Sequence, residues 1–439
     1  IDDASEAFRD IEIRRNQSYF LNFYKRLQGI TFQTTQQLNK HLSSSTMVSG
    51  SIAKGKFTRN LIAAQEGNQG PYRLKGANNE FFFIVLANTE RVFIDGQLLS
   101  RGEDQDYVIN YNSAEITFTP RRMITKDSRI QVEFEYADRN FLNANVFLAQ
   151  EFELNKKLKI SLGYFSNSDA KNSTINQELD PAQKQFLSGI GDSIQNALYP
   201  SATLDTFAAG KVLYQKIYFN PGTGIDSFYQ YSTDPQLAKY SLSFITVGDG
   251  KGNYVPDFNG ANGKVYKYVA PIAGVKQGSY EPVTILVTPK KQQILNFGID
   301  YAITKNTNLK TELATSNSDV NTFSSKNNGD DRGYAAKFQL ASNKSLDSLR
   351  GLVLNTSLDY EYVQRKFKPL ERLRGVEFGR DWGLEAFLPL ADEQIVRAGA
   401  GLKNGKGHSV NYLLTQYHRS DNYDGFQQSL QHSFNWKGW

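Results

Sequence analysis

The chain has 439 residues, 50 basic and 45 acidic side chains, a formal net charge of +5 and no cysteine. The absence of cysteine excludes disulfides and thiolate metal sites. The basic excess is small and dispersed, so nucleic acid is not an expected partner. No stretch of about 18 consecutive apolar residues occurs, which excludes a conventional transmembrane helix. The aromatic content of 13% and the 34 glycines are typical of β-structure in an extracytoplasmic protein.

Length permits either two or three soluble domains or one barrel of a dozen or more strands. The mean hydropathy of −0.50 resembles that of a soluble protein. A transmembrane β-barrel gives a similar average, because only alternate residues of each strand face lipid and the loops are polar. The chain begins at Ile1 without a signal-peptide pattern, so we expect a mature or partial chain.

Residues 1–10 (IDDASEAFRD) are polar without an apolar face and are predicted to be a linker. Residues 11–140 contain short runs of mixed alternation, such as GITFQTTQQL and MVSGSIAKGKF, separated by glycine and polar turns. This pattern predicts a region rich in antiparallel β-hairpins. Its strands belong either to a barrel or to an extramembrane β-module, and the sequence leaves both alternatives open.

Residues 70–138 are the best-defined unit of this region. A tight hairpin is predicted at Asp95-Gly96 and a second one at Asn112-Ser113. In the following strand, alternation predicts one apolar and one charged face. The apolar face carries Ile130, Val132, Phe134 and Tyr136, and the charged face carries Gln131, Glu133 and Glu135.

Residues 141–439 show strands of roughly ten residues in hairpins. Short polar turns are predicted at 155–157 and 304–307, and long polar loops at 166–180 and 316–332. In RGLVLNTSLDYEYV, alternation separates an aliphatic face that ends in tyrosine from a polar one, as in a lipid-facing band with an aromatic girdle. The first face carries Leu352, Leu354, Thr356, Leu358 and Tyr360, and the second carries Asn355 and Asp359. The predicted fold is an all-β, antiparallel transmembrane β-barrel with long loops.

Two segments, 180–235 and 246–292, interrupt this rhythm. The first predicts a helix that begins at Asp180-Pro181 and places Phe186, Ile190, Ile194 and Leu198 on one face. The second is dense in glycine and proline. We expect both to be large ordered loops or small extramembrane insertions.

Three stretches carry a resemblance to a known family: the segment from GANNEFFFIVLAN to FEYADRN, GKGNYVPDFNGANGKVYKYVAPIAGVKQGSYEPV, and RKFKPLERLRGVEFGRDW. They resemble large Bacteroidota outer-membrane proteins of poorly described function, over most of residues 11–390. The hairpin DYVINYNSAEITFTP is also similar to hairpins of the type IX secretion translocon barrel. The resemblance implies an outer-membrane location and a barrel architecture, but no activity.

The family's members are much longer than this chain, so the resemblance implies a partial chain. The C-terminal residues point the same way. A barrel's last strand normally ends on an aromatic residue with apolar residues at alternate positions before it. Trp439 instead shares its face with Lys437, Asn435 and Ser433, which favours truncation.

The four histidines are scattered without metal-ligand spacing, and no GxSxG motif is present, so we expect no enzyme activity. The glycine-rich loop DGKGNYVPDFN offers oxygen ligands of the kind that Ca²⁺ uses, and calcium is the one cofactor considered. The alternative is a tight turn in which Asp and Asn bond their own backbone. The candidate ligands are Asp249, Asn253, Asp257 and Asn259.

The strongest basic patch lies in the run RKFKPLERLR. It predicts contacts with anionic lipid head groups, with lipopolysaccharide phosphates or with a lumen, and its alternative is a solvated turn. Its members are Arg365, Lys366, Lys368, Arg372 and Arg374.

The favoured hypothesis is an integral outer-membrane β-barrel that serves as scaffold, pore or subunit of an envelope transport or assembly complex. Its expected partners are outer-membrane lipid, lipopolysaccharide and other envelope proteins. The alternative is a secreted or surface-attached adhesin of β-sandwiches, whose strands would be polar on the outside. A substrate-specific channel is a third hypothesis, which the sequence does not separate from the first because strand register decides which residues face the lumen.

Overall fold

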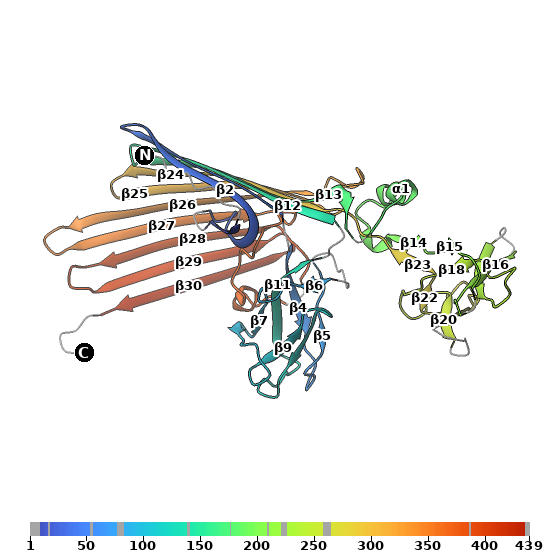
Figure 1. The fold of residues 1–439 in the computed structure, drawn as a ribbon. Coiled ribbons are helices and arrows are strands. Elements are labelled where there is room, and N and C mark those ends of the chain that lie inside the picture. The colour runs from blue at the N-terminus through green and yellow to red at the C-terminus, as the bar shows by residue number, and fades with distance from the viewer. Residues whose placement is uncertain are drawn as a thin grey trace. The chain divides into compact units, whose positions relative to one another are not determined.

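The computed structural model is all-β, and its strands pair antiparallel, which confirms the predicted class at that level. The chain forms two compact units, one made of residues 1–178 and 289–439 and the other of residues 179–288. Figure 1 shows the elements of both. The described residues are 9–15, 18–52, 56–76, 83–137, 141–175, 177–208, 210–220, 226–257, 265–385 and 388–434.

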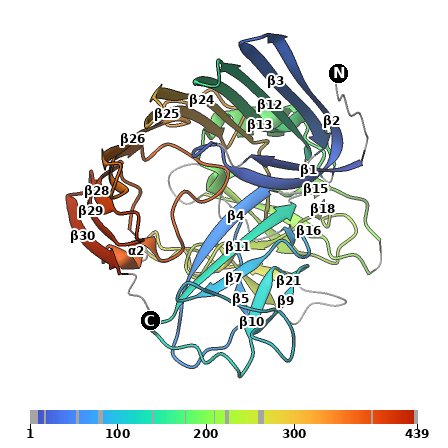
Figure 2. The same ribbon diagram turned by 90° about the vertical axis from the view of Figure 1, so that its left-hand side faces the viewer.

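A 12-stranded antiparallel sheet dominates the first unit, and its strands follow one another around an arc in Figure 2. Among the described residues, β1 and β30 are its two edges and do not pair with each other. In spatial order, the strands are β1 (Arg9–Arg15), β2 (Phe23–Asn39), β3 (Leu42–Ile52), β12 (Phe141–Leu154), β13 (Leu158–Thr174), β24 (Lys291–Thr304), β25 (Thr307–Asp319), β26 (Arg332–Asp347), β27 (Leu352–Val363), β28 (Glu393–Lys403), β29 (Ser409–Arg419) and β30 (Tyr423–Ser433).

The connections of this sheet differ between its two ends. One end has only short turns, at residues 40–41, 155–157, 305–306, 348–351 and 404–408. The other end has the long connections 53–140, 175–290, 320–331 and 364–392, together with the shorter connections 16–22 and 420–422. The predicted turns at 155–157 and 304–307 are confirmed. The predicted loops 166–180 and 316–332 began too early, because β13 and β25 continue to Thr174 and Asp319.

The two faces of the sheet have inverted polarity for a protein in water. The outer face exposes apolar side chains, and Leu358 is 42% exposed. The inner face buries polar ones, and Glu361 is 0% exposed. The predicted alternation in β27 is confirmed, since Leu358 and Tyr360 are exposed while Asp359 lies on the inner side, paired with Lys337.

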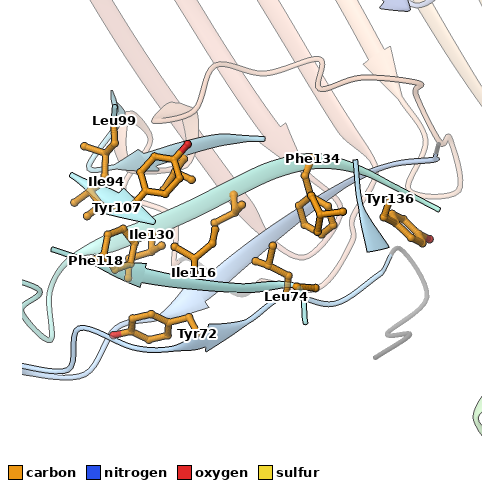
Figure 3. Close-up of a cluster of buried hydrophobic side chains, with 14 of the residues drawn as sticks. Tyr72, Leu74, Ile94, Leu99, Tyr107, Ile116, Phe118, Ile130, Phe134 and Tyr136 are labelled. Atoms are coloured by element: carbon orange, nitrogen blue, oxygen red, sulfur yellow. The ribbon is translucent and has the colours of Figure 1, made fainter. Parts of the chain in front are cut away.

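Residues 56–137 form a separate module of two small sheets. The orders are β5-β10-β9 and β4-β11-β7-β8, with β6 also on β11. Sixteen buried apolar residues of its described part form its core, and Figure 3 shows many of them between the strands. The strands are β4 (Lys56–Ala63), β5 (Tyr72–Arg73), β6 (Ile84–Val85), β7 (Arg91–Ile94), β8 (Gln97–Leu98), β9 (Tyr107–Asn110), β10 (Glu115–Phe118) and β11 (Arg129–Ala137).

The predicted hairpins of the module are present. Asp95 and Gly96 link β7 to β8 with φ of 49° and 79°, the positive values that a two-residue hairpin loop requires. The second hairpin turns through residues 111–114, a longer loop than the predicted dipeptide. The charged face predicted for β11 is not solvated, because Gln131 and Glu133 are as buried as the apolar residues opposite.

The predicted boundaries of the N-terminal region need two corrections. Residues 9 and 10 belong to β1, so the linker does not extend to residue 10; residues 1–8 lie outside the described part. The region 11–140 is not one entity either. Its strands up to β3 join the large sheet, whereas β4–β11 form the module, so each predicted alternative holds for a different part.

The second unit contains a helix and ten short strands among its described residues. The two-stranded sheet is β14-β23, and the four-stranded sheets are β15-β18-β16-β17 and β19-β22-β20-β21. The elements are α1 (Pro181–Gly189), a 3₁₀ turn (Ile194–Asn196), β14 (Leu198–Pro200), β15 (Thr203–Leu204), β16 (Tyr214–Phe219), β17 (Asp226–Tyr231), β18 (Tyr240–Ser241), β19 (Ile245–Thr246), β20 (Tyr254–Asp257), β21 (Val265–Tyr268), β22 (Tyr280–Glu281) and β23 (Val283–Ile285).

The helix start was predicted correctly, since Asp180 caps α1 and accepts a bond from the Gln183 backbone N–H. The predicted extension to Leu198 was wrong, because α1 ends at Gly189 and Gly191 has a positive φ of 62° that stops the helix. The two predicted insertions are also one unit. Residues 236–245, which had been left between them, supply β18 to the sheet of β15 and β16.

The packing of the 364–392 loop on β26 can be tested at Gly333. A Cβ there would lie 2.1 Å from the Phe367 backbone nitrogen, so Gly333→Ala forces the loop away and is expected to cost about 1–3 kcal/mol. The measurement is urea unfolding combined with limited proteolysis of the loop. Gly50→Ala is the matched control, because nothing lies within 4 Å of its added Cβ. Equal behaviour of the two variants would contradict this packing.

Candidate functional site

The inner face of the large sheet is occupied by the turn between β1 and β2. The Glu312 carboxylate of β25 accepts bonds from the Ser18 hydroxyl (2.5 Å) and from the backbone N–H groups of Tyr19 (2.8 Å) and Phe20 (2.9 Å). The Asn296 amide also donates to the Ser18 oxygen at 3.1 Å. A buried carboxylate is tolerated only with such donors, so Glu312 fixes this turn against the sheet.

The loop 364–392, which contains α2 (Phe378–Asp381), covers more of the same face. Its Phe367 packs edge-on against Phe20 at 5.6 Å between ring centroids. Leu370 joins a buried cluster with Phe165 and Ile294 of the sheet. Two connections from opposite ends of the sequence therefore meet inside the curved sheet.

Beside them lies a network of buried charges. The Lys337 ammonium of β26 contacts Asp359 at 3.2 Å and Glu361 at 3.1 Å, both on β27. Arg374 from the covering loop binds Glu361 and Glu393, the latter at 2.8 Å. A further cation, Arg397 of β28, bonds Asp359 at 2.9 Å. The network thus joins three neighbouring strands to the loop.

Arg374 stays charged at this position. Burial alone lowers the pKa of its guanidinium, but Glu361 and Glu393 outweigh that effect and raise the pKa above its ordinary value. The Lys337 ammonium additionally lies 4.1 Å from the centre of the Tyr19 ring, a cation–π geometry. Neighbouring carboxylates and an aromatic face thus compensate the desolvation of the cations.

The network borders a cleft of about 520 Å³ on the inner face. Its lining is almost wholly polar and includes Tyr19, Lys337, Asp359 and Arg397, with Leu413 as the apolar exception. Such a surface holds water and small polar or ionic solutes. The candidate functional site is therefore a polar interior that is partly filled by two loops.

The predicted basic patch is divided by the structure. Arg372 pairs with Glu133 of the module at 2.9 Å, and Arg374 belongs to the internal network, so neither forms part of a solvated turn. Arg365 and Lys368 are exposed, and the Lys366 ammonium donates to the Gly329 carbonyl at 2.9 Å. Of the predicted patch, only Arg365, Lys366 and Lys368 are left for contacts with lipid or lipopolysaccharide.

The predicted calcium ligands are not brought together. Asp249 lies in a turn with Gly248 and Gly250 at positive φ and accepts a bond from the Ser279 hydroxyl. Asp257 ends β20, four extended residues beyond Asn253 and therefore about 13 Å further along the strand. The tight-turn alternative fits this geometry, and Asn259 lies outside the described residues.

Sequence analysis missed most of the internal network. Asp359 had been placed on the polar face of its strand, but Glu312, Lys337 and Glu361 had not been singled out. One signal was available: each is a charged residue at an inward position in the middle of an otherwise amphipathic strand. Alternation identifies such positions, but it does not identify which charges meet.

The geometry defines the chain as an all-β protein with a curved 12-stranded antiparallel sheet, a polar interior and a separate β-module. A family model described as Domain of unknown function (DUF8818) matches residues 57–138, which correspond to the module. None of the curated proteins or solved structures compared with the chain gives a significant match. In the described part of the chain, neither α1 nor α2 offers an apolar stretch long enough to span a membrane.

The network gives a prediction for Arg374→Met. Removal of this cation leaves Glu361 short of a partner in a site without solvent, so the expected loss of folding free energy is about 3–5 kcal/mol. The exposed Arg350, with a side chain 86% accessible, provides the control variant Arg350→Met, expected to stay within about 0.5 kcal/mol of the parent. Urea unfolding in mild detergent measures both.

A double variant, Arg374→Met with Glu361→Gln, tests the pairing itself. Because the second change removes the uncompensated carboxylate, the double variant should lose clearly less free energy than the sum of the two single losses. Additive losses would show that the two side chains are not coupled.

Proposed function

We propose that this protein is a non-enzymatic integral outer-membrane protein whose 12-stranded sheet forms part of the wall of a transmembrane β-barrel. In this role it is a scaffold, pore or subunit of an envelope transport or assembly complex. The observation that carries the proposal is the inverted polarity of the sheet, apolar outside and charged inside. An exposed apolar surface of this extent is unfavourable in water but suits contact with lipid.

The distribution of aromatic residues on the outer face supports the same proposal. Tyr301 and Tyr412 are exposed near the short-turn end of their strands, while Tyr334 and Tyr360 are exposed near the opposite end. Between these levels the exposed side chains are largely aliphatic, such as Leu313. Two aromatic levels that flank an apolar band are typical of barrels at the two membrane interfaces.

The lengths of the strands and the pattern of their connections also support a transmembrane barrel. A tilted strand needs about 9–11 residues to cross the hydrocarbon core, and β24 to β30 have 11 to 16 residues each. Short turns at one end and long connections at the other are usual in outer-membrane barrels. The resemblance to large Bacteroidota outer-membrane proteins points to the same location.

The polar interior supports a solvated lumen, and the loops that fill part of it would limit passage. The module and the second unit are then the natural regions for contacts with other envelope proteins. Arg365, Lys366 and Lys368 are the basic residues best placed for lipid head groups or lipopolysaccharide. No cofactor and no catalytic residue forms part of this proposal.

The alternative, an adhesin of β-sandwiches, has one observation in its favour. The module at 56–137 has a closed apolar core between two sheets, as a sandwich requires. The large sheet argues against extending this to the whole chain, since its apolar side chains lie on the exposed face.

Leu358→Arg tests the membrane location. Leu358 lies on the outer face of β27, and a lipid-facing arginine near the midplane costs about 2–4 kcal/mol. Folding yield into phospholipid vesicles, followed by heat-modifiable mobility on gels, should fall strongly. The matched control is Leu349→Arg, because Leu349 is 100% exposed in the turn between β26 and β27.

Two outcomes would overturn the proposal. One is unchanged vesicle folding of Leu358→Arg relative to Leu349→Arg. The other is recovery of the parent protein as a monodisperse species in buffer without detergent.

A further inference from the structure

A second groove, of about 710 Å³, lies in the first unit and shares Arg374 and Glu393 with the charge network of the interior. One wall is the end of the β4/β11 ladder, within residues 59–64 and 126–131. The other is made by the loop, within residues 374–385 and 388–391, together with Glu393, Tyr417 and Arg419 of the large sheet. This size is within the range of about 300–1,000 Å³ that is usual for ligand pockets. The groove and the polar cleft have no lining residue in common.

Arg59 on β4 faces this groove without a partner of its own. It stands opposite Glu133 in the β4/β11 register. The Glu133 carboxylate is already engaged by Arg372 at 2.9 Å and by the Gln131 amide at 3.0 Å. The Arg59 side chain forms no hydrogen bond or ion pair within the described part of the chain, because the carboxylate opposite it is already paired with the Arg372 guanidinium.

The surroundings of Arg59 make its lack of an anionic partner more unfavourable. Its side chain remains accessible from the groove, but nearby protein removes part of its hydration. This desolvation, with Glu133 opposing it and Arg372 adding repulsion, lowers the pKa of Arg59 from its ordinary value. An additional anion beside Arg59 would compensate both the desolvation of its guanidinium and the repulsion from Arg372.

The remainder of the groove is apolar at its floor and mixed at its rim. Leu61, Leu388 and Leu390 expose 41%, 37% and 70% of their surface. The rim carries basic and acidic groups together, and its Arg380 is paired with Glu377 at 3.1 Å. Six basic residues line the groove against four acidic ones, so the groove carries an excess of positive charge to which Arg59 contributes.

We propose that this groove binds an extended polypeptide segment of a partner protein, with a carboxylate against Arg59 and apolar side chains against Leu61, Leu388 and Leu390. β4 is the edge of its sheet, and no described strand pairs with its second side. Every second residue of an edge strand directs its N–H and C=O away from the sheet. A peptide strand satisfies these groups, whereas a lipid does not.

The binding test uses the full chain in mild detergent and two fluorescein-labelled peptides, one alternating valine with glutamate and one alternating valine with lysine. Fluorescence anisotropy at low salt should show saturable binding of the glutamate peptide and none of the lysine peptide. Arg59→Glu should weaken binding about tenfold or more, as expected when one partner of a desolvated charge pair is reversed. Arg350→Glu, at an exposed turn arginine, should leave binding unchanged.

A second measurement keeps the test valid if Arg59→Glu folds poorly. Leu390 is replaced by a photo-crosslinking phenylalanine analogue in an otherwise native chain, and the glutamate peptide should be captured there. Absence of capture, or equal binding of both peptides, would overturn the proposal. So would binding of phosphatidylglycerol vesicles that depends on Arg59 while neither peptide binds. None of these readouts requires that the sheet crosses a membrane, so the result is independent of the function proposed above.

Discussion

The Glu361 carboxylate is the charge on which the interior of this protein depends. It has no exposed surface, and its two nearest cations come from different elements, Lys337 from the neighbouring strand β26 and Arg374 from the loop 364–392. A buried carboxylate without both would be strongly unfavourable. The register of β26 on β27 and the path of the loop are therefore set together by one electrostatic requirement.

The same loop also neutralises a buried carboxylate in the module. Arg372, two residues before Arg374, pairs with Glu133 and lies 5.3 Å from the centre of the Phe93 ring. Glu133 is nearly inaccessible for that reason. The short run from Arg372 to Arg374 thus pairs with one carboxylate in the module and one in the sheet, so a movement of the loop out of the interior would remove a cation from each of them.

Sequence alone predicted what is local and failed where partners are distant. Alternation in β27 and turn residues such as Asp95-Gly96 gave correct strands and hairpins, because these depend on neighbours along the chain. Apolar spacing up to Leu198 suggested too long a helix, since Gly191 stops it. The burial of Glu133 depends on Arg372, which is 239 residues away, and no periodicity contains that information. For the same reason Arg372 was taken for part of a surface patch.

The sheet and the module gain stability from different terms. In the module, apolar side chains are buried between two small sheets, so burial from water stabilises it as it does any soluble domain. The sheet also buries apolar side chains on its inner side, such as Phe147, Phe165 and Ile294, where the two loops cover it. Beside these clusters it holds internal ion pairs, and much of its remaining apolar surface faces outward. The family model that matches residues 57–138 therefore coincides with the part of the first unit that has a closed apolar core of its own.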